Sequence, residues 1–254
     1  MRRDVLELRS FYATPMGCAV RTMVGRKVAE AWGDAAGLDV LALGYATPFL
    51  GGLRDTARRT VAVMPAQQGV EAWPAGGRNF ACLADEFALP LPNALFDRVL
   101  VAHGLEESDD PAVFLDEVWR VLAPSGRVII VAAARMGLWA DAEKTPFGHG
   151  RPFTRGQLES LVRDAELEPL AWSRALYVPP APGLMRFAEG FEMVGSKLWP
   201  GISGLILLEA VKQTFAVKPK PARLRARIPA TLLPTPVGVA PPAGAGFQPG
   251  RKTH

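Results

Sequence analysis

The fold is decided by residues 80–131, FACLADEFALPLPNALFDRVLVAHGLEESDDPAVFLDEVWRVLAPSGRVIIV. The apolar run 80–83 predicts a strand, and 96–102 predicts a second strand after a Leu-Pro-Leu-Pro turn. Apolar residues at helical spacing then predict a helix that begins near Pro111. After Arg127 the run to Val131 is continuously apolar, as strands buried on both faces are. This order of strand, strand, helix and strand predicts a wound α/β sheet.

Several short motifs occur in this stretch in a fixed order. They are Asp85, Leu89-Pro90, Phe96-Asp97-Arg98-Val99 and Arg120-Val121-Leu122-Ala123-Pro124-Ser125-Gly126. In this order and spacing they resemble the cofactor domain of class I S-adenosylmethionine-dependent methyltransferases, especially the type 11 group. The resemblance implies a Rossmann-like, seven-stranded, mostly parallel sheet with helices on both faces and an antiparallel last strand. It also implies S-adenosylmethionine as the cofactor, and no metal.

Composition and charge predict one folded domain and a tail. The chain has 254 residues, of which 49% are hydrophobic and 21% charged, which is enough for a full core. We expect a methyltransferase-like domain over 1–216, with an N-terminal helical cap over 1–35. The rest, 217–254, is basic and rich in proline, which predicts a disordered tail. Its charge suggests nucleic acid as a partner, and a solubilising tail without a partner is the alternative.

The sequence also indicates where the protein resides. No apolar run is long enough for a membrane span, and the arginines near the amino terminus are not followed by the apolar core of a signal peptide. Cys18 and Cys82 are far apart and lack metal-type spacing, so we interpret both as reduced, buried side chains. These features predict a cytoplasmic protein.

The first predicted strand, 37–43, leads into the loop where the resemblance places the cofactor. The cofactor-binding residues that it implies there are Gly44, Tyr45 and Ala46. Such loops are rich in glycine because the backbone must bend sharply and approach the ligand. This chain departs from the family pattern, since Ala42 replaces an acidic residue and Ala46 and Pro48 replace glycines. We expect Pro48 to suit the opening of the next helix.

The second predicted strand, 59–64, carries the largest departure. Family members end this strand with an acidic residue that binds both ribose hydroxyls, and here the matching position is Met64. Loss of a hydrogen bond to a charged group costs about 1.5–3 kcal/mol. Gln67 or Gln68 could supply a neutral replacement, and a solvated helix start is the alternative.

Four residues complete the cofactor site that the resemblance implies: Asp85, Glu86, Ala102 and His103. Asp85 matches the residue that accepts from the adenine amino group, and Glu86 is its neighbour. His103 follows the fourth strand, at the edge where open α/β sheets bind ligands. It could contact the cofactor, act on the substrate or only hold the following loop. We interpret Glu106 and Glu107 as part of a solvated, acidic helix entrance.

The segment 134–152 is too apolar and aromatic for a plain linker. It follows the fifth strand, so it lies at the ligand edge, and long loops in compact domains are often functional. His149 lies between two glycines and Arg151 follows the second of them, and at glycines the backbone can approach a ligand closely. With Trp139 they are the substrate-side candidates, and a structural lid is the alternative. The catalytic candidates are therefore His103, His149 and Arg151.

Three functions remain open at this point. The first is methyl transfer from S-adenosylmethionine to an unidentified acceptor. The second is a catalytically inactive methyltransferase fold that serves as a binding or scaffold protein, which Ala42, Ala46 and Met64 favour. The third is an RNA-associated methyltransferase that uses its basic tail. Phe11 and Tyr12 could form part of a lid over the site or simply fasten the first helices to the sheet.

Overall fold

The computed structural model describes residues 2–198 and 200–213. They belong to a compact unit, Met1–Phe215. The predicted tail at 217–254 and its expected contact with nucleic acid lie outside the described residues. Across the described part of the chain, no helix combines the length and apolar character needed to cross a membrane.

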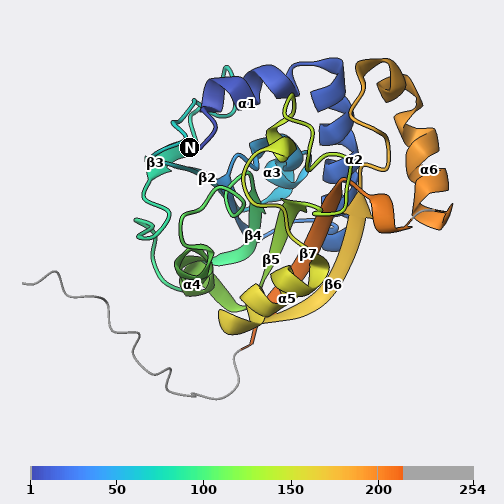
Figure 1. Ribbon diagram of the computed structural model, residues 1–254. Coiled ribbons are helices and arrows are strands. Elements are labelled where there is room, and N and C mark those ends of the chain that lie inside the picture. The colour runs from blue at the N-terminus through green and yellow to red at the C-terminus, as the bar shows by residue number, and fades with distance from the viewer. Residues whose placement is uncertain (1, 199, 214–254) are drawn as a thin grey trace, which may run out of the picture. The chain divides into compact units, whose positions relative to one another are not determined.

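A seven-stranded sheet forms the centre of the molecule (Figure 1). The spatial order is β3-β2-β1-β4-β5-β7-β6, in which β7 runs antiparallel to both β5 and β6 and the other pairs are parallel. This confirms the predicted fold class, including the antiparallel last strand. The strands are β1 (Asp39–Gly44), β2 (Arg59–Pro65), β3 (Ala81–Ala84), β4 (Phe96–Ala102), β5 (Leu122–Ala133), β6 (Leu167–Ala175) and β7 (Leu205–Lys212).

Helices cover both faces of this sheet. The α-helices are α1 (Val5–Tyr12), α2 (Pro15–Trp32), α3 (Leu53–Thr56), α4 (Pro111–Val121), α5 (Arg155–Asp164) and α6 (Ala188–Leu198). Four short 3₁₀ turns accompany them: η1 (Thr47–Phe49), η2 (Pro146–Gly148), η3 (Pro182–Phe187) and η4 (Pro200–Ile202). Buried side chains of α1 and α2 share one core cluster with one face of β1 and β4, and those of α4 and α5 share a second cluster with the other face.

Local sequence explains where three of these helices begin. Thr14 caps α2 by accepting from the Gly17 amide at 3.1 Å, and Pro15 follows it at the first helical position. Asp110 caps α4 in the same way. Thr154 and Gln157 form a reciprocal capping box at the start of α5. The predicted start of a helix near Pro111 is therefore confirmed.

In the segment after β1, Pro48 opens a helical turn as expected, but this turn does not continue as a long helix. The segment forms the η1 turn and then α3, which spans only Leu53–Thr56. Gly51 between them has a φ of 43° and Gly52 follows directly, so the backbone has two positions of low helix propensity in a row. The long helix that usually follows the first strand is therefore absent here, and an open groove lies in its place, lined by Arg21, Pro48, Gly51 and Gly52.

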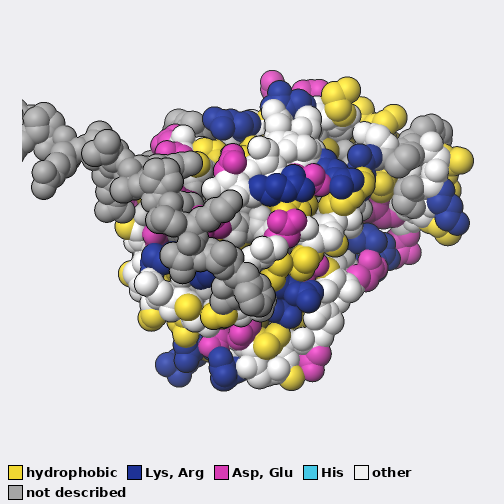
Figure 2. Space-filling view, turned by 90° about the horizontal axis from the view of Figure 1, so that it is seen from below, with side chains coloured by type: hydrophobic (Ala, Val, Ile, Leu, Met, Phe, Trp, Pro, Cys, Tyr) yellow, Lys and Arg dark blue, Asp and Glu magenta, His cyan; other side chains and the backbone are white. Residues whose placement is uncertain are grey.

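The surface bears charges of both signs. On the face shown in Figure 2, Lys and Arg side chains lie among Asp, Glu and hydrophobic side chains. Opposite charges at neighbouring positions screen one another, so the described residues of this face form a mixed surface and not a single basic stripe.

Candidate functional site

The strand order places a ligand site where β1 and β4 lie side by side. β1 pairs with β2 on one side and β4 on the other, so the chain reverses its direction of growth between β1 and β4. Ligands of open α/β sheets bind at the carboxyl ends of strands at such a point. Gly44 and Ala102 are the last residues of these strands and are partners in the register.

Gly44 is required by the close packing of its backbone. Its φ is 81°, and a Cβ atom at this position would lie 2.3 Å from the Ala102 carbonyl oxygen. The next amide, of Tyr45, donates to the same oxygen at 2.8 Å. The predicted loop residues Gly44, Tyr45 and Ala46 thus lie at the expected edge, where they are buried against β4.

Aromatic and polar side chains fill the space above this edge. The Tyr12 hydroxyl lies 2.6 Å from Nε2 of His103, and the Tyr12 ring stacks on Tyr45 with centroids 5.8 Å apart. The Phe147 ring lies 4.6 Å from the His103 ring. Burial lowers the pKa of His103 to about 3, so its imidazole is neutral. The cluster therefore joins α1, both central strands and the η2 turn.

The expectation that Glu106 lies in a solvated, acidic helix entrance is wrong. This residue is buried, and Oε2 of its carboxyl group has no hydrogen-bond partner among the residues described. Burial raises the pKa of Glu106 to about 7, partly offset by backbone N–H groups nearby. Burial also raises the pKa of the half-buried Glu107. Segments that are distant in sequence pack against Glu106 and bury it. One of them is the 134–152 loop, where the Arg151 amide donates to the Glu106 carbonyl at 2.8 Å.

The two acidic residues after β3 have different surroundings. Asp85 is exposed, and its side chain accepts from the Phe87 amide at 2.9 Å. Glu86 is buried and forms a bidentate ion pair with Arg2, in which Nη2 lies 2.9 Å from Oε1. Ser108 donates to the same carboxylate oxygen at 2.9 Å. Of the two, Asp85 is the carboxylate that remains accessible to a ligand.

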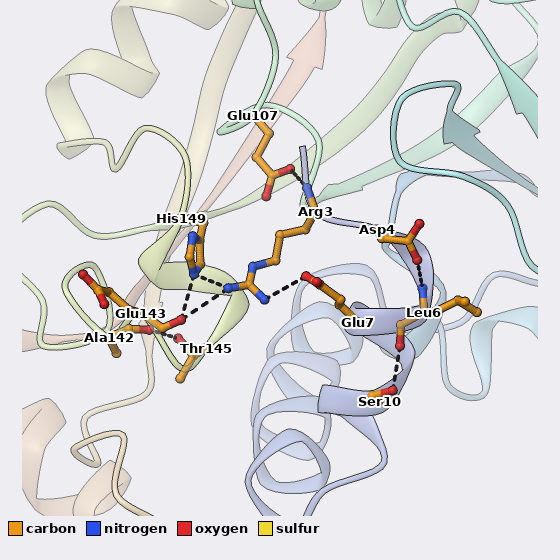
Figure 3. Close-up of polar contacts among 10 residues, drawn as sticks. All are labelled: Arg3, Asp4, Leu6, Glu7, Ser10, Glu107, Ala142, Glu143, Thr145 and His149. Atoms are coloured by element: carbon orange, nitrogen blue, oxygen red, sulfur yellow. Dashed lines mark hydrogen bonds and ion pairs between the residues drawn. The ribbon is translucent and has the colours of Figure 1, made fainter. Parts of the chain in front are cut away.

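Residues 2–12, which we call the N-terminal segment, lie across the carboxyl edge of the sheet. Figure 3 shows Arg3 between the segment's own Glu7, at 3.1 Å, and the loop that holds Glu143 and His149. The Arg3 amide donates to Glu107 at 2.7 Å, and the Val5 amide donates to the Gln68 carbonyl at 2.8 Å. The segment therefore contacts the loops that follow β2, β3, β4 and β5.

The substrate-side candidates of the 134–152 loop separate in the structure. Trp139 is fully buried and donates to the Val178 carbonyl at 2.8 Å, so it is a core residue. His149 is half-buried, and its Nε2 lies 2.7 Å from the Glu143 carbonyl oxygen. Arg151 is exposed. His149 also contacts Arg3 of the N-terminal segment that covers the edge.

The resemblance implies that the nucleoside half of S-adenosylmethionine binds near the end of β2. Whether it fits there depends on the polar groups that the nearby residues present. Met64 is fully buried and presents no polar group. Gln68 is 1% exposed, yet neither its Nε2 nor its Oε1 has a hydrogen-bond partner within the described chain. A buried amide without partners is costly, and two ribose hydroxyls could satisfy both atoms. With the exposed Asp85, which follows the neighbouring strand β3, the residues fit a nucleoside.

An open pocket lies beside the filled cluster. Its volume is about 560 Å³, and its walls come from α1, α2, the loop after β1, α3 and the loop after β2. The lining side chains that matter below are Arg9, Tyr12, Arg21, Tyr45, Arg54, Glu71 and Trp73. Sequence reasoning missed this pocket, because single arginines and a lone tryptophan at scattered positions give no local pattern.

Comparison with known proteins gives a consistent picture of the central region. A family described as "Methyltransferase domain" matches residues 42–130. A demethylmenaquinone methyltransferase of Thermus thermophilus is 44% identical over 48 residues, which is 19% of this chain and 22% of that protein. The ubiquinone/menaquinone biosynthesis C-methyltransferase UbiE of Ralstonia nicotianae is 37% identical over 70 residues, which is 28% of each chain. The chain thus matches only about a quarter of these relatives' length.

Solved structures share the fold over most of the chain. A SAM-dependent methyltransferase of Thermotoga maritima superposes with a TM-score of 0.57 at 18% identity, covering 82% of this chain and 96% of that one. The cyclase SpnF gives 0.53 at 20% identity, with 75% and 80% covered. A 1,6-didemethyltoxoflavin-N1-methyltransferase of Burkholderia thailandensis, solved with S-adenosylhomocysteine, gives 0.50 at 17% identity, with 75% and 76% covered. At these identities the similarity establishes the fold alone.

Proposed function

We propose that the chain belongs to the class I S-adenosylmethionine-dependent methyltransferase family and transfers a methyl group from S-adenosylmethionine to an acceptor molecule, which the methyltransferase-domain match at 42–130 and the shared fold support. The observation that carries this proposal is the Gly44 turn at the junction of β1 and β4, within the matched domain at 42–130. Ligand sites of open α/β sheets occur at this junction. The acceptors in the names of the quinone methyltransferases are theirs, and a quinone acceptor for this chain would be one candidate among several.

When bound, S-adenosylmethionine supplies a methyl group that its sulfonium already activates. The protein's part is then to hold donor and acceptor in line and to exclude water. We assign Gly44, Tyr45 and Ala46 to the methionine half of the cofactor. We assign Gln68 and Asp85 to the nucleoside half, in place of the acid that Met64 lacks. Ala102 forms the floor of this site with Gly44.

Two buried groups could handle a proton. The Glu106 carboxyl group holds or releases a proton near neutral pH, since burial brings its pKa to about 7. The neutral His103 imidazole shares a hydrogen bond with Tyr12 and can orient that hydroxyl. His149 and Arg151 remain candidates on the acceptor side. None of these groups is required by the chemistry, because a base is needed only when the acceptor must lose its proton early.

The alternative is a methyltransferase fold that serves as a binding protein. It is favoured by the packing of Tyr12 and Tyr45 against each other above the junction, and by the Arg2 side chain that holds Glu86. The fold also occurs in a cyclase, so it does not fix the chemistry.

Isothermal titration of S-adenosylmethionine and S-adenosylhomocysteine into the full chain tests the proposal. We expect micromolar binding, and a loss of about tenfold for Asp85→Ala and for Gln68→Ala, since each removes a hydrogen bond to the nucleoside. The matched control is Asp109→Ala, an exposed acid in the loop after β4. An absence of binding up to millimolar ligand would contradict the proposal and favour the binding-protein alternative.

A further inference from the structure

The open pocket beside the aromatic cluster is lined by more positive than negative side chains. Three arginines line it, Arg9, Arg21 and Arg54, against one carboxylate, that of Glu71. Glu71 is already engaged, because it accepts from the Tyr45 hydroxyl at 2.6 Å and pairs with Arg9 at 3.6 Å. The charge that remains for a ligand is therefore positive.

Arg21 is the arginine best placed to hold an anion. It lies on α2 with its side chain exposed at the pocket wall, and among the described residues its guanidinium donates to the weak acceptor Sγ of Cys18 at 3.9 Å. Arg54, in contrast, is paired with Asp55 at 2.6 Å. An exposed guanidinium without a carboxylate partner forms charge-assisted hydrogen bonds with a carboxylate or phosphate at little cost.

The walls of the pocket are aromatic and flat. Tyr12 and Tyr45 stack with an interplanar angle of 24° and form one side. Trp73, which is half-buried, lines the pocket from the loop after β2, with the Arg54 guanidinium 6.0 Å from its ring centroid. Aromatic surfaces of this kind favour planar ligands, and about 560 Å³ lies within the usual range of about 300–1,000 Å³ for small-molecule sites.

From these observations we infer that this pocket binds the methyl acceptor, and that the acceptor is a planar aromatic anion with a carboxylate or phosphate group. The assignment of this ligand as the methyl acceptor rests on the proposed function. The inference does not assign the pocket to the donor, because S-adenosylmethionine carries a sulfonium and an ammonium against one carboxylate, and the Arg21 guanidinium repels its net positive charge. The anionic group would contact Arg21 and the ring would lie between Trp73 and Tyr45.

Titration of two matched probes into the full chain at low salt tests the charge requirement. Indole-3-acetate carries the anion, and indole-3-acetamide has the same shape without it. We expect the acetate to bind about tenfold more tightly than the amide, since one charge-assisted pair at a partly exposed site is worth about that factor. Phenyl phosphate, as a third probe, distinguishes a phosphate preference from a carboxylate preference.

Variants then locate the site. Arg21→Gln should reduce the affinity for indole-3-acetate about tenfold and leave that for the amide unchanged. Arg26→Gln is the matched control, because Arg26 is an exposed arginine of the same helix that pairs with Glu30 outside the pocket. Trp73→Ala should weaken both probes.

Several results would overturn the inference. They are equal affinity for acetate and amide, binding of neither probe, an equal loss in Arg26→Gln, or displacement of indole-3-acetate by S-adenosylmethionine. The donor titration described above is independent of these probes. Binding of indole-3-acetate without binding of S-adenosylmethionine would support the anion pocket and contradict methyl transfer. The reverse pattern would leave methyl transfer standing and overturn the pocket.

Discussion

Replacement of Glu106 by glutamine is expected to raise the free energy of unfolding at pH 8 by about 2–3 kcal/mol. Burial raises the pKa of Glu106 from 4.5 to about 7 in the folded protein. The folded state therefore binds this proton more tightly than the unfolded state does. The contribution to stability is fully present below about pH 4.5 and is lost as the pH rises through 7. Glutamine keeps the shape and never ionises, so the loss disappears.

His103 makes the opposite contribution over an overlapping range. Its pKa is lowered from 6.5 to about 3 by burial and by the nearby charge of Arg3. Stability from this residue is present above about pH 6.5 and is lost as the pH falls toward 3. Between about pH 4.5 and 6.5 the two contributions oppose each other, so the wild-type curve should be nearly level there. Glu106→Gln should expose the His103 slope.

Urea unfolding at half-unit steps from pH 4.5 to 8 measures both effects. Glu143→Gln is the matched control, because the Glu143 side chain is exposed and only its carbonyl oxygen joins the network. A Glu106→Gln variant with the same profile as the control would show that this carboxyl group ionises freely in the folded protein.

The second large effect concerns the ion pair that holds the N-terminal segment. Arg2→Ala should destabilise the protein by up to about 3 kcal/mol, because it leaves the Glu86 carboxylate buried with Ser108 as its remaining side-chain partner. Glu86→Ala should cost less, about 1 kcal/mol, since the Arg2 guanidinium keeps the Gly104 carbonyl oxygen as an acceptor at 3.2 Å. The order of the two variants is the distinctive part of this prediction.

Hydrogen exchange locates the effect as well as its size. In Arg2→Ala the Val5 amide, which donates to the Gln68 carbonyl, should exchange faster, while amides of the central strands should keep their protection until global unfolding. Arg163→Ala removes an exposed ion pair with Glu159 on α5 and is the control. Equal costs for Arg2→Ala and Glu86→Ala would contradict a buried carboxylate that depends on Arg2.

Local patterns predicted most of the fold. The fourth strand begins at Phe96 and ends at Ala102 as its sequence indicated, and Thr154 caps α5. Both features depend on interactions within a few residues. The strand follows from an apolar run bounded by turns, and the helix start follows from a side chain that accepts from the backbone of the first turn. The short α3 was not predicted, because the effect of two successive glycines after Pro48 depends on what else can cover β1.

The location of the site could be predicted from the sequence, but its contacts and burial could not. The edge formed by Gly44 and Ala102 follows from the strand order that the motifs indicated. The burial of Glu106 does not follow, because its neighbours in sequence are acidic and its cover comes from the N-terminal segment and the 134–152 loop. The anion pocket combines five separate segments, and such a combination has no signature in any one of them.

The contacts of the N-terminal segment also have a consequence for biosynthesis. Arg2 and Tyr12 leave the ribosome before their partners Glu86 and His103, which follow 84 and 91 residues later in the chain. The apolar face of α1, with Leu8 at its centre, must therefore wait for the sheet before it can be buried. In a growing chain α1 therefore docks late, and during that interval its apolar face is a surface that chaperones or neighbouring nascent chains would meet.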